Sequence, residues 1–336
     1  MANRMSGGRC RQMKVLVYGA GVIGGQIAHA LSKSGNEVTV LARGEWAETL
    51  RRKGLRIHHF IQKTDTTDHP HVITQLNDQA YDAVFAVMQY RQMERILPDL
   101  AKVNSPVVVL TGNNLSVDEM EKTILRDSNG SKTVLFGFGS TAGVRRNGIL
   151  TAVHTGDGKL TIGKAHEDMP ENLKMRIRQL FSGSRMSVSF CDNMDAWLKY
   201  HAAFILPVVH LSYKTGCDLK KASRAERRLV LDAAKDAYHL LMELGYPVRP
   251  KGDEKTLEPG LLRALASLIL ALAAKTEIGA LCTVEHCRSA CGEMEDLDTA
   301  FEKIRARRPD FPMPDYDRLR HSMPAWKTIR EEYGKK

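Results

Sequence analysis

The first half of the chain alternates short apolar runs with amphipathic stretches of helical length. Each apolar run is long enough for a strand, and the first two helical stretches end at a glycine, a residue that favours helix ends. Strands separated by helices of this length predict right-handed crossover units and a mostly parallel sheet. The expected strands are residues 13–19, 36–43, 80–88, 106–112, 132–143 and 159–163, and the expected helices are residues 22–35, 45–54 and 93–103.

The pattern changes beyond about residue 168, where long helical stretches replace the apolar runs. One short strand is expected at residues 187–190. The Ala- and Leu-rich stretch 260–275 is expected to be a buried helix. The polar segments 62–70 and 248–258 contain Pro or Gly and many charges, and are expected to be loops. The expected helices are residues 170–182, 193–214, 223–245, 259–281, 283–307 and 316–332.

These patterns predict two domains, which a length of 336 residues also favours. Residues 1–12 are expected to form a flexible leader, because they are polar and lack the apolar core of a signal peptide. An α/β domain of the Rossmann type is expected at residues 13–168. An all-α C-terminal domain is expected at residues 169–336, where it would contribute substrate contacts and dimerisation.

A glycine-rich motif, GAGVIG, follows the first expected strand and opens the first expected helix. Gly19 suits the tight turn, Gly21 lets the backbone approach a pyrophosphate, and Gly24 lets helix and strand pack closely. The phosphates would then lie at the positive end of the helix. The motif predicts dinucleotide binding by residues Gly19, Ala20, Gly21, Val22, Ile23 and Gly24.

Arg43, at the end of the second expected strand, indicates which dinucleotide binds. An acidic residue at this place would bond the ribose hydroxyls of NAD, but this strand ends without one. A guanidinium pairs well with a 2′-phosphate. The sequence therefore predicts NADPH as the cofactor.

The chain carries a formal net charge of +10 and has a pI of about 9.3. Its basic residues are dispersed along the sequence. An anionic cofactor and an anionic substrate would explain a positive cleft as well as nucleic acid would, so nucleic acid is not an expected partner.

No apolar run reaches the ~18–20 residues of a membrane span, so a membrane is not an expected partner either. The six cysteines show no metal-type pairing and the histidines no metal spacing, so a reducing cytoplasm and no metal are expected.

Lys199 lies in the apolar run AWLKYHAAFILPVV, residues 196–209. An unpaired ammonium is costly to bury, so this lysine is expected to reach water, pair with an acid or serve in chemistry. Reduction of a ketone by hydride transfer develops negative charge on oxygen, and a lysine aimed at that oxygen supplies the proton.

The chain resembles the ketopantoate reductase family, the NADPH-dependent 2-dehydropantoate 2-reductases. The resemblance rests on GAGVIGGQIAHAL and GNEVTVLAR near the start, on DAVFAVMQYRQ and VVVLTGNN in the middle, and on DAWLKYHAAF at the start of the helical half. It implies reduction of a 2-keto acid, a small-molecule carbonyl substrate such as ketopantoate, in pantothenate biosynthesis, and it allows a homodimer.

The resemblance also implies roles for individual residues. Lys199 falls on the lysine that protonates the carbonyl oxygen, and Asn113 on an asparagine near nicotinamide and substrate. Glu293, about 20 residues before the Pro-rich DFPMP, falls where the family has a glutamate that binds the substrate hydroxyl. Gln89 occupies the place of a lysine near the cofactor.

The chain departs from the family where the substrate would bind. Ala203 and Pro207 stand where the family has asparagines, and neither side chain donates a hydrogen bond. Asn114 replaces the glycine of an Asn-Gly pair, which is tolerable because asparagine also adopts positive φ. His201, His210 and His286 are candidate replacements for the missing polar contacts.

Three functions therefore remain open on the sequence. The first is an active NADPH-dependent reductase of ketopantoate or a related carbonyl. The second is an NADPH-binding protein with an altered substrate or little catalysis, since Gln89 and Ala203 lack the family's chemistry. The third is a basic interaction protein that uses the Rossmann domain as a scaffold.

Overall fold

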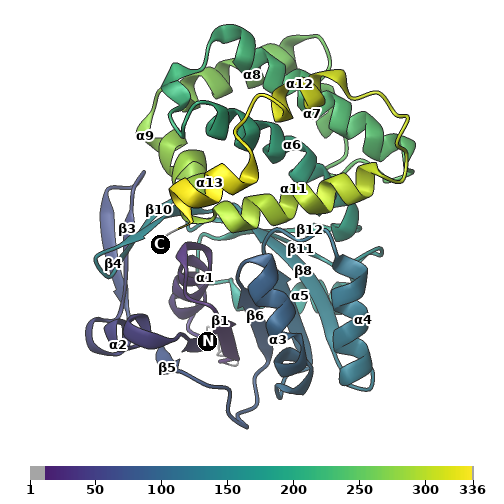
Figure 1. Ribbon diagram of the computed structural model, residues 1–336. Helices are drawn as coiled ribbons and strands as arrows, with labels where there is room; N and C mark the ends of the chain where they lie inside the picture. Colours follow the sequence, from purple (N-terminus) through teal and green to yellow (C-terminus); the bar gives the residue numbers. More distant parts are fainter. Residues whose placement is uncertain (1–11, 335–336) are drawn as a thin grey trace, which may run out of the picture.

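The computed structural model describes residues 12–334, so nearly all of the expected leader, residues 1–12, lies outside the described residues. A sheet-bearing half and a helical half lie against each other, with the helical half uppermost in Figure 1. The fold class predicted from the sequence is confirmed, because a Rossmann-like α/β half is followed by an all-helical one.

The main sheet has eight strands in the order β12-β11-β8-β7-β6-β1-β2-β5. All neighbouring pairs are parallel except β8 and β11, which confirms the mostly parallel sheet. The strands are β1 (Lys14–Tyr18), β2 (Glu37–Leu41), β5 (His71–Ile73), β6 (Ala83–Val87), β7 (Val107–Thr111), β8 (Thr133–Gly139), β11 (Lys159–Gly163) and β12 (Ser187–Cys191).

Helices cover both faces of this sheet because its central strands are apolar on both sides. Alternate residues of β1 serve different cores: Val15 and Val17 pack in one cluster, Leu16 and Tyr18 in the other. The first cluster takes residues from α1, α2 and α5, and the second takes residues from α3 and α4. These helices are α1 (Val22–Lys33), α2 (Gly44–Lys53), α3 (Tyr90–Lys102), α4 (Val117–Asp127) and α5 (Glu171–Leu180).

A second, four-stranded sheet has the order β4-β3-β10-β9 and packs beside α1. The expected loop at 62–70 is wrong, because Thr64–Asp68 forms β4, paired antiparallel with β3. This edge strand is mostly exposed, so its sequence has no apolar alternation to reveal it. The remaining strands of this sheet are β3 (Leu55–His59), β9 (Ala142–Arg146) and β10 (Ile149–Val153).

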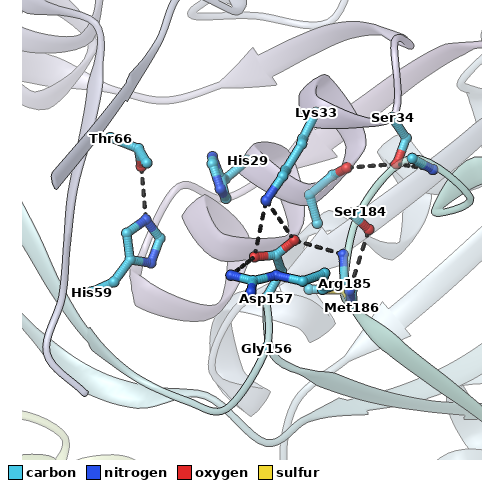
Figure 2. Close-up of polar contacts among 12 residues, drawn as sticks. His29, Lys33, Ser34, His59, Thr66, Gly156, Asp157, Ser184, Arg185 and Met186 are labelled. Atoms are coloured by element: carbon cyan, nitrogen blue, oxygen red, sulfur yellow. Dashed lines mark hydrogen bonds and ion pairs between the residues drawn. The ribbon is translucent and has the colours of Figure 1, made fainter. Parts of the chain in front are cut away.

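Polar contacts tie α1 to its surroundings (Figure 2). His29 of α1 lies 2.8 Å from the carboxylate of Asp68, and Lys33 Nζ lies 3.0 Å from the nearer carboxylate oxygen of Asp157. Asp157 also accepts a bond from the backbone N–H of Arg185, while Gln26 donates to the Asp157 carbonyl. The helix that would carry the cofactor is thereby held along its length.

The main sheet extends past the boundary expected at residue 168. Strand β12 pairs with β11 over Lys159–Gly163, and the helical half begins only at Met194. We propose that the first domain ends after Cys191, so that the second domain begins at about residue 192.

The helical half begins with two long helices close to the expected ranges, α6 (Met194–Lys214) and α7 (Arg224–Glu243). The single helices expected at 259–281, 283–307 and 316–332 are wrong, since each is interrupted. The first stops at Ala273 and resumes after Thr276, the second is broken at Ala290, and the third is split at residues 321–325. The remaining helices are α8 (Leu261–Ala273), α9 (Glu277–Gly279), α10 (Glu285–Ser289), α11 (Cys291–Arg305), α12 (Pro314–Arg320) and α13 (Trp326–Tyr333), with a π-helical turn at Ala280–Val284.

The buried helix expected at 260–275 is also wrong in its burial. None of the residues of α8 is fully buried, and six of its leucine and isoleucine side chains are exposed.

Within residues 12–334, no single helix is long and apolar enough to cross a membrane. The pair Leu261–Ala273 and Glu277–Ser289, bent by 91°, passes that test on length and composition alone.

A buried carboxylate, Asp298 of α11, joins four helices of this half. It accepts hydrogen bonds from His210 of α6, Arg320 of α12 and Trp326 of α13, at 2.8 to 3.2 Å. Burial alone would raise the pKa of Asp298, but the bonds from His210 and Arg320 outweigh it and hold that pKa well below its usual value.

Candidate cofactor and substrate site

The glycine loop between β1 and α1 has the close approaches that the motif predicts. Gly19 adopts a φ of +107°, and a Cβ there would lie 2.2 Å from the carbonyl oxygen of Val87. A Cβ on Gly24 would lie 1.9 Å from the carbonyl oxygen of Gly19. A Cβ on Gly21 would meet nothing within 4 Å, so the space above this residue is open. Gly19 and Gly24 are therefore required by packing, whereas Gly21 is free to face a ligand.

The N-terminus of α1 has the electrostatics of an anion site. Its N-cap residue is Gly21, which provides no side-chain cap, and the first turn contains no acidic residue. The leading N–H groups of the helix and the positive end of its dipole are consequently available to a bound anion. A dinucleotide pyrophosphate fits this donor set.

Arg43 stands next to this loop, at the N-cap of α2 and just past the end of β2. Its guanidinium donates to the hydroxyl of Tyr18 at 2.7 Å, and the side chain is otherwise exposed. Trp46 donates to the carbonyl of Ala20 in the glycine loop, and Arg145 of β9 lies over the Trp46 ring, 4.9 Å from its centroid. Sequence reasoning missed Arg145, which comes about a hundred residues after Arg43 and has no motif of its own.

Asn113, Glu293 and His286 are brought together at the boundary between the two halves. Asn113, which follows β7, donates to Glu293 Oε1 at 2.8 Å, and His286 Nε2 lies 3.5 Å from Glu293 Oε2. Glu293 is buried in the first turn of α11, and Figure 1 shows this helix running along the side of the helical half that faces the sheet. A small pocket beside this cluster is lined by Tyr90, Asn113, Leu115, Glu293, Asp296, Leu297 and Ala300.

Gln89 and Asn114 lie at neighbouring strand ends. Gln89 is the N-cap residue of α3, and its backbone carbonyl accepts bonds from the first turn of that helix. Positive φ was expected at Asn114, but among the described residues of this turn it is Gly112 that adopts it, with φ +147°. The Asn114 side chain is buried and accepts a bond from the Ser116 backbone N–H, which closes the turn before α4.

Lys199 is buried in α6 and is not placed against the Asn113–Glu293 pair. Its ammonium is ion-paired with Asp195, one turn earlier on the same helix, and lies 4.8 Å from the centroid of the Tyr246 ring. The sequence left three alternatives for Lys199: contact with water, pairing with an acid, or a role in chemistry. In the structure Lys199 is paired with an acid. The sequence did not reveal it, although Asp195 stands four positions before Lys199.

His201 lies on the side of α6 that is only half-buried. Its ring centroid is 4.1 Å from that of Phe138 on β8, and it stacks on Trp197 with an interplanar angle of 12°. Burial, with a smaller effect from the charge of His286, lowers the pKa of His201 to about 4, so the imidazole is neutral near pH 7. Ala203, expected in the substrate site, is fully buried in the core of the helical half.

Known proteins share this architecture. Residues 15–167 match the family model described as "Ketopantoate reductase PanE/ApbA". Over 88 residues, 26% of this chain, the sequence is 35% identical to the "Uncharacterized oxidoreductase YkpB" of Bacillus subtilis (strain 168), and the match spans 28% of that protein.

Solved structures extend the likeness over nearly the whole chain. The 2-dehydropantoate 2-reductase from Methylococcus capsulatus gives a TM-score of 0.70 at 17% identity, covering 96% of this chain and 99% of that one. D-mandelate dehydrogenase, solved with NADH and anilino(oxo)acetate, gives 0.73 at 14% identity, covering 96% and 100%. The dimeric ketopantoate reductase from Staphylococcus aureus gives 0.66 at 14% identity, covering 96% and 99%.

A glycine loop that opens α1, at the edge of the sheet that faces a helical second half, is the arrangement of the dinucleotide-binding class of α/β proteins. Within that class the resemblance seen in the sequence is confirmed by the family match and by the shared fold. Residues 15–167 thus match the ketopantoate reductase family, and the whole chain shares the fold of solved ketopantoate reductases at low sequence identity.

Proposed function

We propose that the protein is an NADPH-dependent reductase of a 2-keto acid, ketopantoate or a related carbonyl compound. The observation that carries the proposal is the cluster of Asn113, Glu293 and His286, which joins the two halves beside the carboxyl end of β7. In open parallel sheets, ligands bind outside the carboxyl ends of the strands. Two of the solved relatives are described as a 2-dehydropantoate 2-reductase and as a D-mandelate dehydrogenase with anilino(oxo)acetate, which supports a 2-keto acid as the substrate here.

NADPH is proposed over NADH because of Arg43. Its exposed guanidinium is anchored by the Tyr18 hydroxyl and leaves N–H groups free for a 2′-phosphate. Replacement of Arg43 with Ala is expected to weaken NADPH binding about 10-fold to 100-fold, the effect of a lost charge-assisted contact, and to change NADH binding little. Fluorescence titration of both cofactors measures this, with Arg51→Ala, whose partner is Glu48, as the matched control. Equal losses for both cofactors contradict the assignment.

In the proposed reaction, a nicotinamide cofactor held at the glycine loop of Gly19, Gly21 and Gly24 would supply the hydride for the carbonyl carbon. The residues of this chain then hold the substrate and handle the proton. Glu293 accepts the bond from Asn113 on one oxygen and faces His286 with the other, so it is positioned to accept a hydrogen bond from a substrate hydroxyl by exchanging one of these partners. Asn113 would in that exchange be free to donate to a substrate oxygen.

Lys199 is proposed as the proton donor. As hydride adds to carbon, the carbonyl electron pair moves to oxygen, and this oxygen takes a proton from the ammonium. Asp195 holds that ammonium in a dry position, so Lys199 must turn from Asp195 towards the substrate when the site is loaded. Solvent returns the proton to the lysine after product release.

The test is NADPH oxidation, followed by its absorbance, against a panel of 2-keto acids. The wild-type protein is expected to turn over at least one of them. Replacement of Lys199 with Ala should lower kcat about 100-fold or more, the usual contribution of a positioned acid, while leaving NADPH affinity unchanged. Lys214→Ala is the control, because Lys214 lies on the same helix and pairs with Glu226. Unchanged turnover in the Lys199 variant excludes this role.

A second function is favoured by the buried pair of Lys199 and Asp195. If Lys199 stays on Asp195, the chain binds NADPH with little catalysis, and Ala203, which stands where the family has an asparagine, lacks a further substrate contact. Tight NADPH binding with no turnover on the whole panel would support this function against the reductase.

Self-association and location are proposed with the same function. We infer a homodimer, because the Staphylococcus aureus relative described as dimeric shares the fold. The cytoplasm is proposed because the five cysteines within the described residues are all unpaired.

A further inference from the structure

Six of the ten exposed large hydrophobic side chains among the described residues lie on α8. Figure 1 places this helix on the side of the helical half that lies away from the sheet. Its exposed residues are between 49% and 84% accessible, which is unusual for leucine and isoleucine on a monomer surface. They are Leu261, Leu262, Leu265, Leu268, Ile269 and Leu272, and together they are called the α8 stripe.

The spacing within the α8 stripe is that of a helix-pairing seam. Leu261, Leu265, Leu268 and Leu272 are separated by four, three and four positions, the alternation that keeps apolar residues on one line of a helix. At about 100° per residue, all six side chains of the stripe fall within about 120° of the helix surface. The opposite side carries Leu270, which packs on the core of the helical half.

The stripe is also free of charge. The charged residue of α8, Arg263, turns away from it and bonds Asp232 and the carbonyl of Leu257. A partner recognised through acidic or basic groups would therefore find nothing to bind on this surface. An apolar surface without charge is complementary to a copy of itself.

We propose that the α8 stripe is the interface between two copies of this chain, which pack their α8 helices antiparallel around a two-fold axis. In this arrangement Leu265 of one copy lies opposite Leu268 of the partner subunit, and the contact repeats by symmetry. Two stripes face to face remove on the order of 1,000 Å² from water, close to the ~1,200 Å² at which stable interfaces begin. The inference gives a surface to the proposed homodimer and does not depend on the proposed reaction.

A membrane surface suits the stripe less well. Helices that lie in the bilayer interface carry lysine and arginine along their polar side. Here the side of α8 opposite the stripe packs on the protein through Ala266 and Leu270, and the residues around the two ends of the helix include Glu258 and Glu277 as well as Lys275. The flanks thus give no net positive charge to attract anionic lipid.

The experiment measures the mass of the full-length protein by size exclusion with light scattering, from about 1 to 100 µM, because association follows mass action. The wild-type protein is expected to be a dimer. Leu265→Glu and Leu268→Glu should each raise the dissociation constant at least about 100-fold, since each buries a charge in the seam. Met175→Glu is the matched control, because Met175 is 57% exposed on α5, in the other half of the molecule.

A charge-pair variant tests the antiparallel register. Leu265→Lys combined with Leu268→Glu in one chain places opposite charges across the two-fold axis, so this double variant should associate more tightly than either single variant. Circular dichroism checks that every variant keeps the wild-type helix content.

Three results overturn the proposal. A wild-type monomer at 100 µM excludes self-association. If Leu265→Glu and Leu268→Glu both remain dimers, the protein is a homodimer, but the α8 stripe is not its interface. A monomer that floats with vesicles of phosphatidylcholine and phosphatidylserine shows that a bilayer covers the stripe. None of these measurements depends on turnover. Their outcomes therefore neither support nor contradict the proposed reductase activity, which the NADPH oxidation assay tests.

Discussion

Replacing Gly21 and Gly24 with alanine, one at a time, separates the role of the glycine loop in cofactor binding from its role in folding. An alanine Cβ at position 24 would lie 1.9 Å from the carbonyl oxygen of Gly19, so α1 must shift by about 1 Å or more. Forced overpacking of this kind costs about 1–3 kcal/mol of unfolding free energy. At position 21 the Cβ meets nothing within 4 Å, and the backbone (φ −72°, ψ −166°) is one that alanine adopts freely.

Gly21→Ala should therefore keep the unfolding free energy within about 0.5 kcal/mol of wild type. Its added methyl group fills the space through which a pyrophosphate approaches the backbone, so NADPH affinity should fall about 10-fold or more, ~1.4 kcal/mol. Urea unfolding and fluorescence titration of NADPH measure the two quantities on the same samples. The reasoning is refuted if Gly21→Ala binds NADPH like wild type, or if Gly24→Ala is as stable as wild type.

Two further predictions concern buried charge. Burial, followed by repulsion from His29 and His154, lowers the pKa of His59 from its ordinary 6.5 to about 4. Below pH 6.5, His59 is therefore protonated in the unfolded chain but stays neutral in the folded chain. The unfolding free energy should fall by on the order of 3 kcal/mol as the pH drops from about 6.5 to 4. Urea unfolding of His59→Gln should show a weaker dependence of this free energy on pH. Asp298→Ala should cost about 3–5 kcal/mol in the same assay, because His210 and Arg320 lose their shared carboxylate; a cost below ~1 kcal/mol would contradict this role.

The central strands of the main sheet were predictable because they are buried on both faces and are therefore apolar throughout. β6 and β7 contain only buried residues, and both coincide with expected strands. β4 was missed for the opposite reason: its sequence TDTTD lies at a sheet edge, where water contacts most of the side chains. Pairing with β3, and not side-chain burial, makes this segment a strand.

Residues of the cofactor and substrate site were predictable only where a local sequence motif indicates them. The glycine loop could be read from residue spacing, and the family resemblance pointed to Asn113 and Glu293, which the fold brings within 2.8 Å of each other. The position of Arg145 over Trp46 depends on how the second sheet packs beside α1, which no local pattern encodes. Burial of the α8 stripe was predicted wrongly, because apolar content alone does not distinguish a core helix from an exposed one.

The edge of the main sheet has a consequence for how the chain is made. β11 is flanked by β8 and β12, and β12 ends only at Cys191. During synthesis from the N-terminus, a nascent chain released as far as residue 168 would still present β11 as an open strand edge, able to pair with a neighbouring chain. A fragment cut at that point would share this hazard, whereas one that ends after Cys191 carries the whole sheet. With the boundary proposed above, the first domain becomes a complete folding unit about two dozen residues later than its sequence pattern suggests.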